Sequence, residues 1–495
     1  MVAPATPPTE DATLSFARSA VRAVAALGVR QVLVQGANVL GGVLLARLLS
    51  PGEFGVFGIV TFILAFLVAF GGAGLGASLI RQTQEPTTAD YRAVFSVQQA
   101  MVVGVGVLLW LAAPWIAAQY GRPPVEAWLF RLLAIAVFLT SYQTIAAIRL
   151  ERELAFHRLA AVEVSQALVF NGLAVGLAWA GWGAMSFAVA LVARAAVGAV
   201  WMNLISPWPI GWTWDPSRVR EHLRFGILYQ GGSFVSLLKD SITPLFVGFL
   251  LGAKAVGYIN WAGMVAAYPV LALMVFQRFY LPAFARMQDR PAELCRFVGW
   301  VLRATNSLVA PLAVVTLVLV EPLTRIVFGE KWLVALPLFY LLWSANLFVP
   351  TATPLAGLLN ALGDARTPFR FSLLWMTGTW LAGVPLILSF GVVGFAVANL
   401  IVQFSNLLLM RIARARVPFA YRGVFLPAWG AAAAAGLVVF LLARVYPPAS
   451  LWGLAADVGV GGLLYIAGLC ALDLRAAGTA WSWLRSCVWS PASQS

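Results

Sequence analysis

The sequence predicts an all-α protein that crosses a membrane about fourteen times. Hydrophobic residues make up 61% of the 495 residues and charged residues only 11%, a balance far from that of a soluble domain. Apolar runs of about 20 residues recur along the whole chain, and each is long enough for a helix to cross a hydrocarbon core of about 30 Å. The connections between these runs are short, so no segment is left over for a separate soluble domain.

The predicted spans follow one another as apolar runs with polar connections between them. They lie near residues 24–49, 55–80, 93–118, 126–148, 158–180, 183–205, 223–251, 255–284, 296–320, 335–359, 369–390, 392–411, 424–446 and 451–472. The Pro-rich segment 1–22 has no basic start followed by an apolar core, so we expect a disordered cytoplasmic tail rather than a signal peptide. Residues 476–495 are expected to form a second cytoplasmic tail.

The distribution of arginine predicts the orientation, because cytoplasmic loops of membrane proteins are enriched in Lys and Arg. The even-numbered connections carry Arg81, Arg92, Arg149, Arg152, Arg158, Arg218, Arg220, Arg224, Arg286, Arg290, Arg296, Arg366, Arg370, Arg411, Arg414, Arg416 and Arg422. The odd-numbered connections carry few charges. Both termini are therefore expected in the cytoplasm, and this topology accounts for the net charge of +14 without a nucleic-acid partner.

A weak internal repeat predicts two lobes. LLSPGEFGVF at residues 48–57 aligns with LLGAKAVGYI at residues 250–259, an offset of about two hundred residues. Because six spans separate the two copies, the halves should have the same orientation and be related by a pseudo-two-fold axis along the membrane normal. We expect a six-helix N-lobe, a six-helix C-lobe and two additional C-terminal helices, at residues 23–215, 216–416 and 417–475. The first and seventh helices are the expected walls of a cavity between the lobes.

Three stretches resemble a known family. ARLLSPGEFGVFGIV at 46–60, GAGLGASLIRQ at 72–82 and IRLERELAFHRLAAVEV at 148–164 are similar to the polysaccharide branch of the multidrug, oligosaccharidyl-lipid and polysaccharide exporter superfamily. The resemblance implies a flippase for undecaprenyl-pyrophosphate-linked oligosaccharides that works by alternating access in O-antigen, capsule or exopolysaccharide assembly. It also implies a location in the bacterial inner membrane. The implied partners are the lipid-linked oligosaccharide, membrane lipids, and a glycan polymerase with assembly proteins.

Such a substrate needs a hydrated, cationic cavity, and polar side chains within the apolar spans are the candidates for its lining. A charge in hydrocarbon costs several kcal/mol unless it is hydrated or paired. The planar guanidinium of Arg suits phosphate because it binds two oxygens at once and keeps its proton. The predicted substrate-binding residues are Arg30, Gln35, Asn38, Arg47, Arg194, Lys239, Arg278 and Arg303.

Several of these candidates also have a structural interpretation. Arg30, about two turns above the cytoplasmic end of its span, is close enough to snorkel to the interface, and Arg47 can anchor the outer end. Arg194 stands alone in an apolar helix and needs a partner. Asp240, beside Lys239, either forms an ion pair with another helix or couples transport to H⁺ or Na⁺.

The sequence argues against ATP as the energy source. The Gly-rich GGAGLG at residues 71–76 follows an apolar helix rather than a strand, so helix packing or a bend is its expected use. The sequence has no phosphate-cradling loop followed by Lys-Ser or Lys-Thr. We therefore expect the membrane potential or an ion gradient to drive transport, with no cofactor and no metal site.

Two other functions stay open. A multidrug-type cation antiporter of the same fold is expected to show acidic rather than cationic cavity residues. A membrane oligosaccharide polymerase or ligase needs an acid or base on a sizeable outer loop, whereas the longest outer connection here is residues 321–334. Both histidines, His157 and His222, are placed on the cytoplasmic side, so an enzyme is disfavoured.

Overall fold

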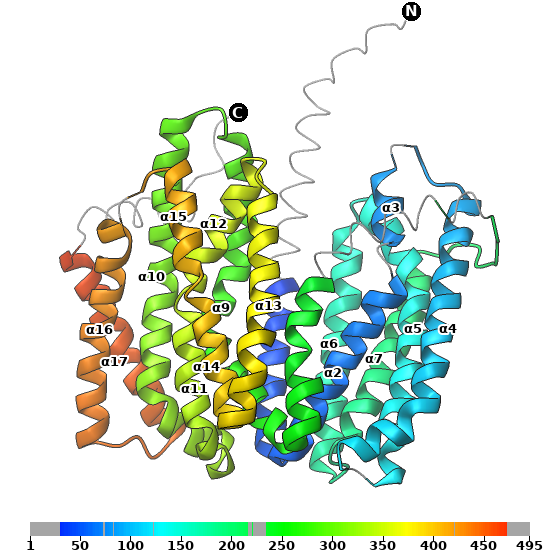
Figure 1. Ribbon diagram of the computed structural model, residues 1–495, viewed down its shortest axis with the longest axis horizontal. Coiled ribbons are helices and arrows are strands. Elements are labelled where there is room, and N and C mark those ends of the chain that lie inside the picture. Colours follow the sequence, from blue (N-terminus) through cyan, green and yellow to red (C-terminus); the bar gives the residue numbers. More distant parts are fainter. Residues whose placement is uncertain are drawn as a thin grey trace, which may run out of the picture. The chain divides into compact units, whose positions relative to one another are not determined.

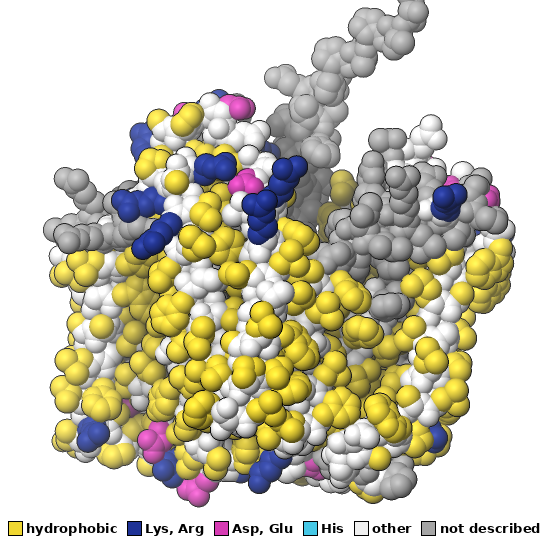
Figure 2. Space-filling view, in the orientation of Figure 1, with side chains coloured by type: hydrophobic (Ala, Val, Ile, Leu, Met, Phe, Trp, Pro, Cys, Tyr) yellow, Lys and Arg dark blue, Asp and Glu magenta, His cyan; other side chains and the backbone are white. Residues whose placement is uncertain are grey.

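The computed structural model describes residues 30–72, 75–82, 84–121, 123–215, 220, 234–419 and 421–472. Within these ranges no residue lies in a β-strand, so the all-α prediction is confirmed. Thirteen segments of the described chain are long and apolar enough to cross a membrane. On the face seen in Figure 2, hydrophobic side chains cover the middle of the helices and charged side chains gather at helix ends. The predicted tails, 1–22 and 476–495, lie outside the described residues.

The difference between thirteen segments and fourteen predicted spans comes from one glycine. The apolar segment Phe234–Leu273 is helical on both sides of Gly252, but the backbone at Gly252 itself is non-helical, with φ 80° and ψ 172°. Such a positive φ favours glycine and interrupts a helix. Two helices therefore lie here, one that ends before Gly252 and one that follows it and continues beyond Leu273 to Arg286, as the seventh and eighth predicted spans require.

The chain divides into two compact units, Met1–Gly257 and Tyr258–Ser495. The division into lobes at residues 23–215 and 216–416 stays a prediction. The first unit contains the first helix (Arg30–Leu48), α2 (Pro51–Gly72), α3 (Leu75–Arg81), α4 (Thr88–Gln119), α5 (Ala127–Arg152), α6 (Phe156–Trp179), α7 (Met185–Ile205), a helix at 234–240, the π-helix η2 (Ile242–Val247) and the start of α9 (Gly248–Arg286). In this unit α5 packs between α4 and α7, and α6 packs on α7 (Figure 1).

Capping residues start two helices of the first unit. The Ser50 backbone N–H and hydroxyl donate to the Glu53 carboxylate at 2.8 and 2.7 Å, and the Glu53 N–H donates back to the Ser50 hydroxyl. Pro51 occupies the first helical position, where its missing N–H costs nothing. Thr87 and Asp90 form an equivalent capping box at the start of α4. The SPGE stretch thus makes the sharp turn between the first two spans.

The second unit is built around α10. Its elements after α9 are α10 (Pro291–Leu323), η3 (Thr324–Phe328), η4 (Glu330–Ala335), α11 (Leu336–Asn346), α12 (Val349–Ala361), α13 (Arg366–Phe390), α14 (Val392–Gln403), α15 (Asn406–Arg416), α16 (Tyr421–Val445) and α17 (Leu451–Leu472). Asn306 on α10 is fully buried; its amide donates to Thr351 Oγ1 of α12 and its oxygen accepts from Trp429 Nε1 of α16. The two C-terminal helices are therefore attached to α10, and Tyr465 of α17 adds a hydrogen bond to the Ser307 carbonyl.

The two copies of the repeat meet within the first unit. A Cβ at Gly55 would clash with the Ala253 carbonyl oxygen, and a Cβ at Gly257 would clash with the Pro51 carbonyl oxygen. In the repeat, Gly55 is equivalent to Gly257 and Pro51 to Ala253, each 202 residues further along the chain. The two contacts are therefore reciprocal, because each glycine lies against the residue equivalent to the other's partner. Reciprocal contacts are what a two-fold relation between two segments produces. Small residues four apart let the backbones of α2 and α9 approach closely, as in membrane GxxxG crossings.

Substituting Gly55 by Ala is expected to destabilise the protein by about 1–3 kcal/mol, because the helices must separate to admit the methyl group. Thermal unfolding of the full chain in detergent measures the effect. Gly104→Ala on α4, where nothing lies within 4 Å of the added Cβ, is the matched control and should leave the melting temperature unchanged or raise it slightly. Equal melting temperatures for Gly55→Ala and wild type would contradict the close crossing.

Candidate functional site

Polar side chains join the first helix to α6. Arg30 Nη1 lies 2.8 Å from Glu163 Oε2, and Asn171 Nδ2 donates to Asn38 Oδ1 at 3.1 Å. We call these four residues the polar seam. Arg30 and Asn38 are eight residues apart, and so are Glu163 and Asn171, about 12 Å along each helix. Equal spacing in the same direction means that the two helices run parallel, as expected for the first and fifth spans of the predicted topology.

Gly41 gives the polar seam its close fit. A Cβ at this position would overlap the side-chain oxygen of Asn171, which also donates from its nitrogen to the Ala167 carbonyl at 2.8 Å. The amide of Asn171 is 9% exposed and therefore needs these partners. Because position 41 has no side chain, the first helix can approach the buried Asn171 amide closely.

A second polar contact holds α6 against α5 and α7. Gln166 Nε2 donates to Gln143 Oε1 at 2.7 Å. Both amides occupy the space where a side chain at Gly198 on α7 would lie. Gln166 is one turn beyond Glu163, so the backbone that carries Glu163 is fixed by its neighbours.

Arg194 on α7 has the partner that its position required. Its guanidinium lies over the ring of Phe170 on α6, 6.0 Å from the centroid, and it interacts electrostatically with Glu163. Glu163 also lies close enough to Glu151 of α5 for the two carboxylates to repel each other, and Arg30 attracts Glu151 electrostatically. The first unit therefore gathers Arg30, Arg194 and two carboxylates around the N-terminal half of α6.

Glu163 was not among the residues selected from the sequence. The signal was present, since Glu163 lies within the predicted span 158–180 and within the stretch IRLERELAFHRLAAVEV. What the sequence does not show is which residue of another helix lies opposite.

The seventh span carries its charges as a neighbouring pair. Lys239 Nζ lies 3.0 Å from Asp240 Oδ1, so the carboxylate has the adjacent lysine as a partner. The π-helix η2 follows directly, and π-helices are rare elements that are frequent at functional sites. Tyr120, just after α4, donates its hydroxyl to the Pro244 carbonyl at 2.8 Å within this π-helix. Burial raises the pKa of Tyr120 to about 12, so it stays a neutral donor.

The remaining candidates are spread over both units. Gln35 is partly buried in the first helix, and Arg47 is exposed in its last turn. Arg303 is exposed on α10 in the second unit, where its Nε donates to the Gly299 carbonyl at 3.3 Å. Arg278 is in α9 of the same unit, and its side chain lies outside the described part. Within the first unit, Arg30, Asn38 and Arg194 come together around α6.

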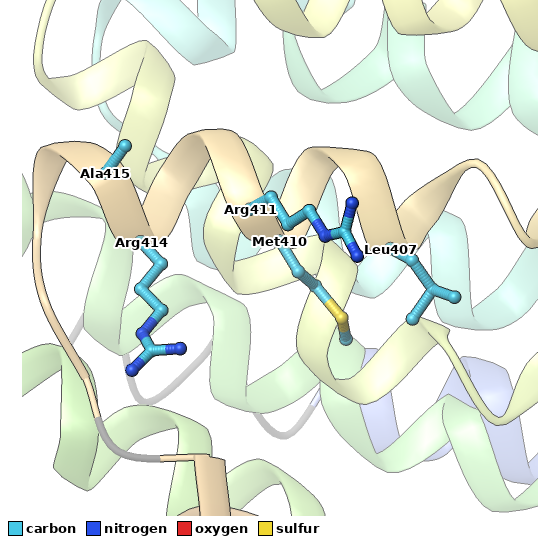
Figure 3. A pocket seen from close by; sticks show the side chains of 5 residues that line it. All are labelled: Leu407, Met410, Arg411, Arg414 and Ala415. Carbon is cyan, nitrogen blue, oxygen red and sulfur yellow. The ribbon is translucent and has the colours of Figure 1, made fainter.

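A separate pocket follows one face of α15. It has a volume of about 610 Å³, and the lining side chains are at positions three to four residues apart, from apolar Leu407 and Met410 to Arg411 and Arg414 (Figure 3). The predicted topology places Arg411 and Arg414 at the cytoplasmic end. In the described residues no group of His, Cys, Asp or Glu is arranged to hold a metal ion.

Comparison with known proteins finds the same family that the sequence motifs resemble. Residues 44–337 match the family described as "Polysaccharide biosynthesis protein". The chain is 25% identical over 338 residues to the succinoglycan biosynthesis transport protein ExoT of Rhizobium meliloti (strain 1021), covering 68% of each chain. It is 24% identical over 388 residues to the lipopolysaccharide biosynthesis protein WzxC of Escherichia coli (strain K12), covering 76% of this chain and 77% of WzxC.

A solved structure shares the fold over almost the whole chain. The lipid II flippase MurJ in an inward closed conformation superposes with a TM-score of 0.74, covering 92% of this chain and 99% of MurJ at 12% identity. At this identity the likeness concerns the fold alone. It confirms the polytopic helical architecture predicted from the apolar runs.

Substituting Gly41 by Ala is expected to lower the free energy of unfolding by about 1–3 kcal/mol, because the methyl group meets the Asn171 amide. Adding Asn171→Ala removes that amide, so the double variant should lose less than the sum of the two single variants. Thermal unfolding in detergent measures all three. Gly36→Ala on the same helix, where the added Cβ meets nothing within 4 Å, is the control. If the two single variants' losses of unfolding free energy simply add in the double variant, the contact between Gly41 and the Asn171 amide would be contradicted.

Proposed function

Because the chain belongs to the polysaccharide biosynthesis protein family, we propose that it is a flippase for undecaprenyl-pyrophosphate-linked oligosaccharide repeat units. The substrate would cross the bacterial inner membrane for O-antigen, capsule or exopolysaccharide assembly. Both chain termini are proposed to lie in the cytoplasm. The names of two relatives, one in succinoglycan and one in lipopolysaccharide biosynthesis, support the glycan, and a lipid II flippase with the same fold supports a lipid-linked substrate.

The observation that carries the proposal is the placement of arginines inside membrane-spanning helices. Arg30 and Arg194 both lie on spans, and both interact with groups of the same unit rather than standing alone. A pyrophosphate carries several acceptor oxygens, and a guanidinium binds such oxygens in a bidentate manner. Asn38 and Gln35 on the first helix supply amides suited to sugar hydroxyls. Guanidinium groups for the pyrophosphate and amides for the sugar together suit an anionic lipid head group.

The proposed cycle is alternating access, driven by the membrane potential or an ion gradient rather than ATP. The head group enters from the cytoplasm and binds Arg30, Lys239 and Arg278, with Arg47, Arg194 and Arg303 along its route. Asp240 is the candidate coupling group for H⁺ or Na⁺, and its pairing with Lys239 at 3.0 Å gives it a cation that binding of the ion would replace. A glycan polymerase and assembly proteins are the proposed partners on the outer side.

The two other functions predict different chemistry. A multidrug-type antiporter for cations needs carboxylates facing its substrate, whereas the charges around α6 are balanced between Arg and Glu and those on α10 include the exposed Arg303. A polymerase or ligase needs an acid or base on an outer loop. The predicted outer connection 321–334 is occupied by the compact η3 and η4, with Arg325 between Glu321 and Glu330. A transporter accounts for these features better than an enzyme.

Substituting Arg30 by Ala is expected to reduce surface-glycan export in cells by about 10- to 100-fold, the loss that a charge-assisted contact of about 1.5–3 kcal/mol gives. Quantification of the glycan in a strain that lacks the chromosomal copy measures export, and immunoblotting of membranes checks that the variant is inserted and abundant. Arg290 lies between α9 and α10, is exposed, and pairs with Glu293 in the first turn of α10. The control variant Arg290→Ala should therefore export the glycan normally. Normal export by Arg30→Ala would contradict the proposal.

A further inference from the structure

Glu163 forms an ion pair with Arg30. The proposed function assigns the same binding position on Arg30 to the lipid phosphate. The two side chains are 2.8 Å apart, and they are 18% and 35% exposed, so the pair is sheltered yet open to an entering anion. A carboxylate and a phosphate offer the same two-oxygen edge to a guanidinium. From this competition we infer that Glu163 is a resident counter-anion: it pairs with Arg30 in the empty protein and is displaced by the substrate phosphate. The inference rests on the proposed function.

The polar seam does not need this ion pair to keep its register. Asn38 and Asn171, with Gly41, already fix the first helix on α6 two turns further along. Gln166 and Gln143 fix α6 against α5 one turn beyond Glu163. The Arg30 and Glu163 side chains are therefore free to change partners while the backbones stay in place.

Arg194 is the cation with which the displaced Glu163 carboxylate would pair. It already interacts electrostatically with Glu163, and its guanidinium is held over the Phe170 ring at 6.0 Å. When phosphate takes Arg30, Glu163 keeps a cation opposite it. Arg30 and Glu163 each then face an opposite charge at both stages, which matters because an unpaired charge in hydrocarbon costs several kcal/mol.

The exchange has two consequences for the substrate. A neutral head group cannot displace a carboxylate from a guanidinium, so Glu163 selects for anions. Once the head group is exposed on the far side, Glu163 competes for Arg30 again and promotes release. Glu163 is thus a positioning residue that acts on the substrate through Arg30.

The test is the affinity of purified full-length protein for farnesyl pyrophosphate, with farnesol as the uncharged probe. Glu163→Gln keeps the size of the side chain and removes its charge, so we expect binding of farnesyl pyrophosphate to become about tenfold tighter. Release should slow, so the turnover of lipid-linked oligosaccharide in proteoliposomes should fall although affinity rises. Farnesol binding should not change. Glu151→Gln removes the same charge from the neighbouring helix and should change affinity by no more than about threefold.

The outcomes separate this inference from the proposed function. If wild type binds farnesyl pyrophosphate no better than farnesol, the proposed function is wrong. If Arg30→Gln abolishes preferential binding but Glu163→Gln binds no tighter than wild type, only the exchange is wrong. An equal gain in Glu151→Gln would likewise overturn it, because the effect would then be general electrostatics. Glu163→Asp keeps the charge on a shorter side chain and should give a smaller gain. Should Glu163→Gln fail to fold, unchanged affinity in the Asp variant overturns the exchange.

Discussion

The cost of an unpaired charge in hydrocarbon governs the arrangement of the first unit. Arg30 in the first helix has Glu163 as its partner, Arg194 lies over an aromatic ring, and Lys239 is paired with Asp240. A soluble protein would hydrate such groups, but a membrane-spanning helix has to supply partners from its own or a neighbouring helix. The same pairs also limit what can bind. An anion reaches these arginines only by competing with, or adding to, the groups that hold them.

Close approach of backbones makes those partnerships possible. Between membrane helices there is little hydrophobic driving force, since lipid tails are as apolar as leucine, so packing and hydrogen bonds hold the helices together. Gly41 admits the Asn171 amide, and Gly198 admits the Gln143 and Gln166 amides. Gly55 and Gly257 let the two copies of the repeat touch through their carbonyl groups. Each of these glycines is explained by the atom that occupies the place of its missing side chain.

Much of the fold could be predicted because hydropathy is a local signal, whereas the orientation inferred from arginine placement stays a prediction. The apolar runs correspond to the observed helices, and Ser50 and Glu53 cap the start of α2 in the polar connection between the first two runs. Contacts between helices could not be predicted in the same way. Glu163 opposite Arg30 depends on the relative rotation and register of two helices that are far apart in the sequence, and one sequence does not specify either. The pairing of Asp240 with Lys239 depends on side-chain conformation next to a π-helix.

The account depends on intramembrane arginines receiving an anionic lipid head group. The most direct measurement is translocation in proteoliposomes of one glycan joined to the same polyprenyl chain through a pyrophosphate, a monophosphate or a neutral linkage. The account predicts that the rate falls in that order and that Arg30→Gln slows the pyrophosphate substrate without slowing the neutral one. Equal rates for all three linkages, or equal loss for all three in the variant, would contradict it.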